Sequence, residues 1–215
     1  MSLILCYITD RSQFAGGHAQ QEARLLGKIA ECAAAGVDYI QLREKDLSGR
    51  DLEGLAERAL SAFPGGSPIR LLINSRIDVA LACGASGVHL PAQNVSAGEA
   101  RAVFTRVGAV PPIISVSCHT EEEVAQAQLD GADFVVFGPV FEKAGQASSE
   151  GVQLLSRMCH KKPVAGVAVP VLALGGITLE NAGSCNRAGA RGIAAIRLFQ
   201  QNNAFDVVER LRAIP

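Results

Sequence analysis

The sequence predicts a closed barrel of eight parallel strands that alternate with helices, the (β/α)8 or TIM barrel, with residues 1–215 as a single domain. Three observations predict it: a recurring glycine pattern, an alternation of short apolar runs with amphipathic stretches, and an aliphatic composition. Hydrophobic residues make up 48% of the chain, with no Trp and only 2 Tyr and 8 Phe. Ala, Val, Ile and Leu must therefore build the core, as is typical of parallel strands buried on both faces.

The glycine pattern marks four places where a helix ends and an apolar strand begins, and its copies start at Gly36, Gly84, Gly131 and Gly189. Glycine readily adopts the left-handed backbone conformation that terminates a helix. The copies are roughly 50 residues apart, which is too long for one strand and helix but suits two. The pattern therefore predicts every second strand of the barrel.

The remaining strands are short apolar runs between these copies. In chain order the predicted strands are residues 3–9, the run after Gly36 that ends in residues 41–45, residues 69–74, the run after Gly84 that ends in residues 89–91, residues 113–117, the run after Gly131, residues 170–177 and residues 193–197. Apolar residues three and four apart indicate helices between them, as at Leu52 and Leu55 or at Val207 and Leu211. An open, doubly wound sheet is the alternative, because closure does not follow from the pattern alone.

Charge and cysteine usage exclude several classes of partner. Lys and Arg number 20 against 21 Asp and Glu, without a cluster of either sign, so nucleic acid is not an expected partner. The six cysteines form no C-x-x-C pair and are expected to be reduced. No apolar run approaches the ~20 residues that cross a bilayer, and the amino terminus lacks the basic region of a signal peptide. We therefore expect a cytoplasmic protein without a membrane partner; a homo-oligomer is compatible with the sequence.

Functional residues of such a barrel lie where strands end and the following loops begin. Gln41, Arg43 and Lys45 alternate at the end of the second strand and should share one side of the chain. Arg and Lys there predict an anion site, since a guanidinium fits phosphate or carboxylate and an ammonium adds a point charge. The alternative is that Arg43 forms an ion pair with Glu44 or Asp46.

Further candidates follow the third and fifth strands. Asn74 is expected either at the barrel mouth, where it can bind substrate, or as a helix cap. Ser117 and His119 end the fifth strand, and His119 is the candidate for moving a proton, with an exposed loop histidine as the alternative. His89 is more typical of a buried core residue.

A phosphate site is expected after the seventh and eighth strands. Gly175 and Gly176 leave backbone N–H groups accessible to an anion, and Thr178 to Asn181 should start a helix beside them. Ile196 and Arg197 complete the site, although Arg197 can instead face the outer helices and the glycines can be simple turn residues.

Segments along nearly the whole chain resemble the family of thiamin phosphate synthases and the related thiazole tautomerases. They are Y-I-T-D at Tyr7, G-V-D-Y-I-Q-L-R-E-K at Gly36, L-I-N-S-R-I-D-V-A at Leu72, G-V-H-L-P at Gly87, S-V-S-C-H at Ser115, G-A-D-F-V-V-F-G-P-V-F at Gly131 and L-G-G-I-T at Leu174. The resemblance implies a small phosphorylated heterocycle as substrate.

Two positions and one loop depart from the synthase pattern that the resemblance implies. Synthases carry magnesium on two aspartates, where this chain has Ser75 and Asn94, and a T-x-T-K loop, where it has residues 143–146. Lys143 can partly replace the lost charge and is a substrate-binding candidate.

The resemblance leaves three functions open. The leading expectation is a metal-free thiazole tautomerase, an isomerase in which Arg43 and Lys45 hold the carboxylate and His119 moves the proton. The alternative is a synthase that condenses hydroxymethylpyrimidine pyrophosphate with thiazole phosphate, and the third is a non-catalytic binder of thiazole or thiamin phosphates. No cofactor is expected, except Mg2+ if the synthase alternative holds.

Overall fold

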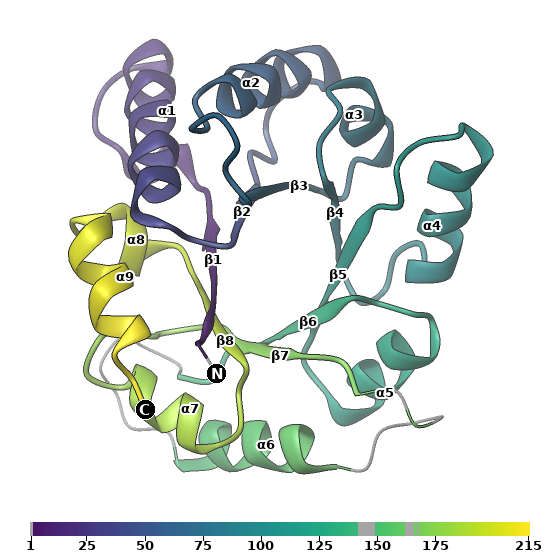
Figure 1. Cartoon of the computed structure of the whole chain (residues 1–215), viewed down its shortest axis with the longest axis vertical. Helices are drawn as coiled ribbons and strands as arrows, with labels where there is room; N and C mark the ends of the chain where they lie inside the picture. Colours follow the sequence, from purple (N-terminus) through teal and green to yellow (C-terminus); the bar gives the residue numbers. More distant parts are fainter. Residues whose placement is uncertain (1, 142–148, 162–165, 167) are drawn as a thin grey trace.

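A computed structural model of the chain describes residues 2–141, 149–161, 166 and 168–215. In this part of the chain, parallel strands close into a barrel in the order β1 to β8 (Figure 1). β1 pairs in parallel with both β2 and β8, which confirms the predicted (β/α)8 barrel and excludes the open sheet.

The strands agree with the predicted runs to within a few residues. They are β1 (Ile4–Ile8), β2 (Tyr39–Leu42), β3 (Arg70–Asn74), β4 (Gly87–Leu90), β5 (Ile113–Cys118), β6 (Phe134–Phe137), β7 (Val171–Ala173) and β8 (Gly192–Ala195). The main differences lie in the last two strands. β7 ends before the glycine pair, and β8 ends at Ala195, so Arg197 begins a helix rather than completing a strand.

Helices surround the ring of strands (Figure 1). They are a short η1 (Arg11–Gln13), α1 (His18–Ala35), α2 (Gly49–Ser61), α3 (Ile77–Ala82), α4 (Ala97–Arg106), α5 (Glu121–Leu129), α6 (Ser149–His160), α7 (Ala182–Arg187), α8 (Arg197–Gln200) and α9 (Ala204–Arg212). Side-chain caps begin several of them: the Ser48, Ser96 and Thr120 hydroxyls accept backbone N–H groups of α2, α4 and α5.

The repeated glycines adopt the predicted conformation. Gly36, Gly84, Gly131 and Gly189 have φ of 90°, 67°, 77° and 98°, and each follows the end of a helix. Left-handed backbone of this kind is accessible to glycine at little cost, which explains why the pattern marks the turn from helix to strand.

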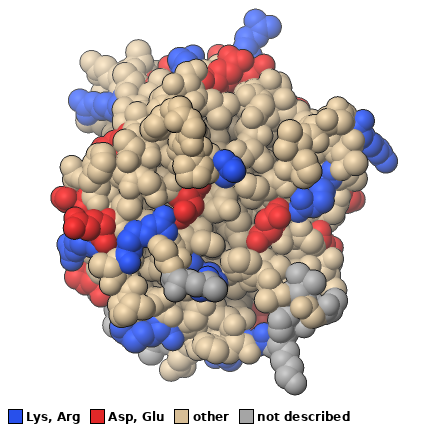
Figure 2. Space-filling view, in the orientation of Figure 1, with Lys and Arg blue, Asp and Glu red and all other residues tan. Residues whose placement is uncertain are grey.

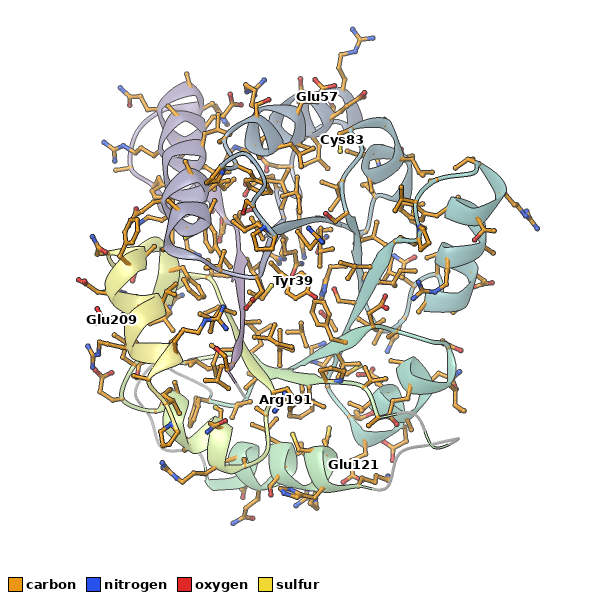
Figure 3. All side chains as sticks on the ribbon, in the orientation of Figure 1. Tyr39, Glu57, Cys83, Glu121, Arg191 and Glu209 are labelled. Atoms are coloured by element: carbon orange, nitrogen blue, oxygen red, sulfur yellow. The ribbon has the colours of Figure 1, made fainter. Side chains whose placement is uncertain are left out.

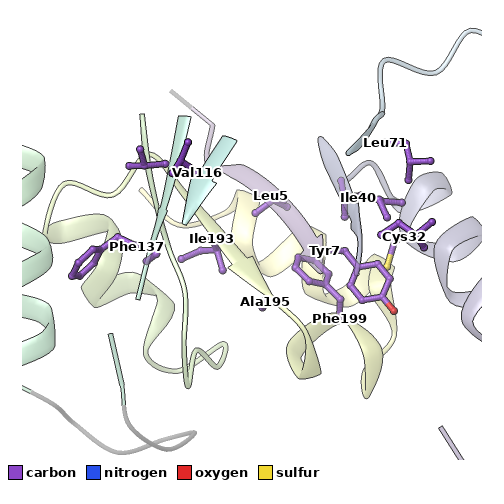
Figure 4. Packing of buried hydrophobic residues seen from close by; sticks show 14 of the residues in the cluster. Leu5, Tyr7, Cys32, Ile40, Leu71, Val116, Phe137, Ile193, Ala195 and Phe199 are labelled. Carbon is purple, nitrogen blue, oxygen red and sulfur yellow. The ribbon is translucent and has the colours of Figure 1, made fainter. Parts of the chain in front are cut away.

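Two apolar layers hold the barrel together. The larger lies between strands and helices and includes Leu5, Ile40, Val116 and Ile193 (Figure 4). The smaller fills the barrel interior with Cys6, Ile8, Leu72, Phe134, Val136, Leu172 and Ala194. In Figure 3, Tyr39 lies within the ring of strands, and its ring centroid is 4.8 Å from that of Phe134. Successive strand residues therefore alternate between the two layers, as expected for strands buried on both faces.

Polar residues replace the interior apolar layer on one side of the barrel. Gln41, Asn74, His89, Ser115 and Ser117 come from β2, β3, β4 and β5, whereas the interior positions of β6 to β8 and β1 are apolar. Because buried polar groups need hydrogen-bond partners, this half of the barrel is where a polar ligand or an internal network is expected.

Candidate functional site

Two neighbouring cavities open at the carboxyl ends of the strands. The first, here the β2 cavity, has a volume of about 590 Å³ and contains Gln41, Arg43, Lys45, Asn74, Ser117 and His119 in its lining. The second, here the β7–β8 cavity, has about 600 Å³ and contains Gly175, Gly176, Ile196 and Arg197. Leu174 and Ile196 line both. The structure therefore groups the predicted site residues into two adjoining chambers with common walls.

Alternation along the β2 segment places its polar residues in the β2 cavity, as the sequence predicts. Gln41 is 2% exposed, and its Nε2 donates to Asn74 Oδ1 at 2.9 Å. Asn74 Nδ2 in turn donates to Ser75 Oγ at 3.0 Å. Asn74 therefore lies in the cavity lining and does not cap α3, whose N-cap residue is Arg76. Gln41 Oε1 is buried without a hydrogen-bond partner in the described part of the chain. An unpaired buried acceptor in a cavity lining matches a ligand that brings an N–H or O–H donor.

Arg43 and Lys45 remain available to a ligand because another residue neutralises the neighbouring carboxylates. Arg11 Nη1 donates to Glu44 Oε2 at 3.0 Å, and both Nη atoms donate to Asp46, at 2.8 and 2.6 Å. The alternative in which Arg43 pairs with Glu44 or Asp46 is therefore wrong. Within the described residues, neither the Arg43 nor the Lys45 side chain forms a hydrogen bond or ion pair, and both line the β2 cavity.

A buried network holds this segment in place. Glu44 also accepts the Thr9 hydroxyl at 2.6 Å, and Thr9 Oγ1 accepts the backbone N–H of Arg43 at 2.9 Å. Thr9, Arg11 and Glu44 are all 5% exposed or less. Buried charges are tolerated when they are paired and fully hydrogen-bonded, so the network fixes the backbone from which the two free cations extend.

His119 lies at the rim of the β2 cavity. Its Nδ1 is 2.5 Å from the carbonyl oxygen of Gly138, and its backbone N–H donates to Glu123 Oε2 at 2.6 Å. A carbonyl oxygen can only accept, so Nδ1 carries a proton and donates it to Gly138. Glu123 also lines the cavity, which the sequence did not single out.

Backbone geometry shapes the β7–β8 cavity. Gly175 and Gly176 have φ of 98° and 61°, and a Cβ on Gly175 would lie 2.6 Å from Pro139 Cα, so both conformation and close packing require glycine there. Their N–H groups donate no hydrogen bond to the described residues. Free N–H groups on left-handed backbone form a concavity that suits an anion. Arg197 is exposed and lines the same cavity.

The expected helix start beside the glycines is wrong in detail. Residues 178–181 form a turn, in which Asn181 Oδ1 accepts the Thr178 N–H at 2.8 Å, and α7 begins only at Ala182. Lys143 lies outside the described residues, as does most of the loop around it.

Other sequence predictions concern the thiols, the surface and the membrane. The six cysteines are free; Cys6, Cys32, Cys118 and Cys185 are buried. Burial raises the pKa of each of these four thiols to about 12, which makes them poor nucleophiles.

On the face of the molecule that Figure 2 shows, Lys and Arg side chains lie among Asp and Glu side chains. Among the described residues, no helix is long and apolar enough to span a bilayer.

These features together define a (β/α)8 barrel that has a cationic, polar cavity beside a glycine-walled one. Residues 5–199 match the family model described as thiamine monophosphate synthase (TMP-TENI). The chain belongs to this family.

Individual relatives agree with the family match. A provisionally named thiamine-phosphate synthase of Geobacter sulfurreducens is 39% identical over 213 residues, covering 98% of this chain and 92% of the relative. The thiamine-phosphate synthase of Chlorobium luteolum is 36% identical, covering 91% and 84%. Among solved structures, thiamine phosphate pyrophosphorylase from Pyrococcus furiosus has a TM-score of 0.78 at 27% identity, covering 99% and 95%.

The expectation of a thiazole tautomerase is wrong. The relatives are named thiamine-phosphate synthases, and the similar solved structure is a thiamine phosphate pyrophosphorylase. The role of His119 in moving a tautomerisation proton falls with it. Ser75 and Asn94, which suggested the tautomerase, therefore mark a departure within the synthase group.

Proposed function

We propose that this chain is a thiamin phosphate synthase, which joins hydroxymethylpyrimidine pyrophosphate to thiazole phosphate and releases pyrophosphate. The observation that carries the proposal is the pair of adjoining cavities, of about 590 and 600 Å³, with Leu174 and Ile196 as shared walls. A two-substrate condensation needs two chambers that meet at the reacting atoms, because holding both reactants in one geometry supplies much of the rate acceleration.

The β2 cavity fits the pyrimidine pyrophosphate. The buried Gln41 Oε1 lacks a donor, which an amino group on a pyrimidine would supply. Arg43 and Lys45 offer charge to the pyrophosphate, the arginine through paired N–H groups and the lysine as a point charge. Ser117 in the same lining adds a hydroxyl. Polar and cationic groups thus occupy the positions that a ring with an anionic tail requires.

The β7–β8 cavity fits the thiazole phosphate. The N–H groups of Gly175 and Gly176, which donate to no described residue, and the guanidinium of Arg197 suit the phosphate. Apolar residues, among them Phe141, Leu174 and Ile177, suit the heterocycle. Such a division places the thiazole ring toward the shared wall and its phosphate toward the glycines.

The chemistry then needs charge stabilisation rather than proton transfer. The thiazole nitrogen lone pair forms a bond to the pyrimidine methylene carbon, and the electrons of the breaking C–O bond leave with pyrophosphate. Negative charge grows on the departing oxygen, where Arg43 and Lys45 act as preorganised cations. No side chain has to accept a proton from the thiazole, which agrees with His119 standing at the rim.

A magnesium ion held by carboxylates does not fit the residues present. The ends of β3 and β4 carry Asn74, Ser75, Gln93 and Asn94, which offer neutral oxygens and nitrogens. Glu123, the carboxylate in the β2 cavity lining, already accepts the His119 N–H. In the described residues no cluster of three or more His, Cys, Asp or Glu forms a metal site. Mg2+ prefers one or two carboxylates besides substrate phosphates, so we assign it no step here.

The direct test supplies both substrates to the purified protein and measures thiamin phosphate by mass spectrometry and pyrophosphate by a coupled assay. The proposal expects the two products in equal amounts. Saturable binding of both substrates without product would remove the synthase and favour a non-catalytic binder. Arg197→Met serves as an internal check, since it should raise the KM for thiazole phosphate about tenfold and leave that for the pyrimidine nearly unchanged.

A further inference from the structure

A histidine inside the barrel bridges two serines. His89 on β4 is 4% exposed, and its Nδ1 lies 2.8 Å from Ser115 Oγ while its Nε2 lies 2.7 Å from Ser117 Oγ. The register of β4 and β5 pairs His89 with Ser115, so the two hydroxyls on the same face of β5 flank the imidazole. Ser117 lines the β2 cavity, whereas Ser115 is 0% exposed.

The imidazole is neutral and so carries a single N–H. Burial, with a smaller contribution from the nearby Arg43 charge, lowers the pKa of His89 to about 3. One ring nitrogen therefore donates a hydrogen bond and the other accepts one. The position of the proton decides which serine receives and which donates.

Ser115 decides the position of that proton. Its hydroxyl has His89 as its one hydrogen-bond partner among the described residues. If Nδ1 carried the proton, the Ser115 hydroxyl could only accept, and its own proton would be buried without an acceptor. Leaving a buried donor unpaired is unfavourable, so Ser115 donates to an unprotonated Nδ1. Nε2 then holds the proton and donates it to Ser117 Oγ.

We propose that Ser115 and His89 are positioning residues that orient the Ser117 hydroxyl as a hydrogen-bond donor to an anionic group in the β2 cavity. Ser117 Oγ already accepts from Nε2, so its own proton is free to point toward the cavity that Arg43 and Lys45 also line. In the opposite tautomer Ser117 would donate to His89 and present only lone pairs, which repel phosphate oxygens. The anion is the pyrophosphate of the proposed function, on which the ligand assignment rests.

Nuclear magnetic resonance on ligand-free protein with 15N-labelled histidine tests the tautomer. The His89 signals are assigned by their loss in His89→Gln. The expected result is a protonated Nε2 with a one-bond coupling to hydrogen and an unprotonated Nδ1 at neutral pH. A protonated Nδ1 would overturn the proposal, and this measurement is independent of any enzymatic activity.

Binding of inorganic pyrophosphate in a double-mutant cycle tests the consequence. Ser117→Ala should weaken binding about tenfold and Ser115→Ala about threefold, whereas adding Ser115→Ala to Ser117→Ala should change nothing further. Ser184→Ala, in α7 outside the barrel interior, is the control and should bind like the wild type. Independent, additive effects would mean that Ser115 acts only on structure and would overturn the proposal. If both tests succeed but the protein forms no thiamin phosphate, the positioning role of Ser115 and His89 stands and the proposed synthase function is wrong.

Discussion

Replacement of Glu44 by Gln should destabilise the barrel by about 3 kcal/mol while leaving its shape intact. The Glu44 side chain is 2% exposed and accepts the Thr9 hydroxyl, the Arg11 backbone N–H at 3.1 Å and the Arg11 guanidinium at 3.0 Å. A hydrogen bond to a charged group contributes about 1.5–3 kcal/mol, against about 1 for a neutral one, so three weakened bonds lose roughly 2–3 kcal/mol. The amide would also turn one donor toward the donors of Arg11. Breaking a buried ion pair costs ~3–5 kcal/mol of stability. Because Arg11 still pairs with Asp46 in the variant, we expect a loss near the lower end of this range.

The matched control is Asp46→Asn, which removes the other carboxylate from the same guanidinium. The Asp46 side chain is 65% exposed, so its loss should change the free energy of unfolding by less than about 1 kcal/mol. Urea denaturation followed by circular dichroism measures both variants, with a shifted midpoint and unchanged slope expected for Glu44→Gln. Equal effects of the two substitutions would refute the argument that buried charge pairing holds the β2 segment.

Two further predictions concern stability. Gly192→Ala should lower the free energy of unfolding by at least ~3 kcal/mol or prevent folding, because a Cβ there overlaps the Ile4 carbonyl oxygen. The control Gly65→Ala, whose Cβ meets open space, should change the free energy of unfolding by less than about 0.5 kcal/mol. Thermal unfolding measures both variants. Below the ordinary histidine pKa of about 6.5 the unfolded chain binds a proton that native His89, with its pKa lowered to about 3, does not bind. The free energy of unfolding should therefore decrease as the pH is lowered from 7.5 to 5, by about 2 kcal/mol more in the wild type than in His89→Gln. An equal decrease in the two proteins would contradict this prediction.

Local signals account for most of what the sequence predicted. The left-handed glycines, the aliphatic strands and the alternation at Gln41, Arg43 and Lys45 depend on a few neighbouring residues, and the barrel follows from their repetition. The end of β8 at Ala195 was less predictable, because Ile196 and Arg197 continue the apolar pattern of the strand while the backbone turns into α8.

Long-range pairs were beyond such signals. Arg11 binds Glu44 across 33 residues of sequence, and the serines that flank His89 lie 26 and 28 residues away. No residue adjacent to Arg43 indicates that Glu44 and Asp46 pair with Arg11, which follows β1. The expectation of a tautomerase was wrong for a related reason. It depended on the absence of two aspartates, at Ser75 and Asn94, and two local substitutions do not by themselves indicate a change of reaction.

Anion binding in the β2 cavity is tested most directly by steady-state kinetics of the Arg43→Met, Lys45→Met double variant. The control variant is Arg50→Met, which removes an exposed cation on α2. The double variant should raise the KM for the pyrimidine pyrophosphate at least about a hundredfold, because two charge contacts are lost, without a matching change in the KM for thiazole phosphate. Arg50→Met should behave like the wild type. A double variant with unchanged KM for the pyrimidine pyrophosphate would contradict the claim that the β2 cavity binds its anionic group.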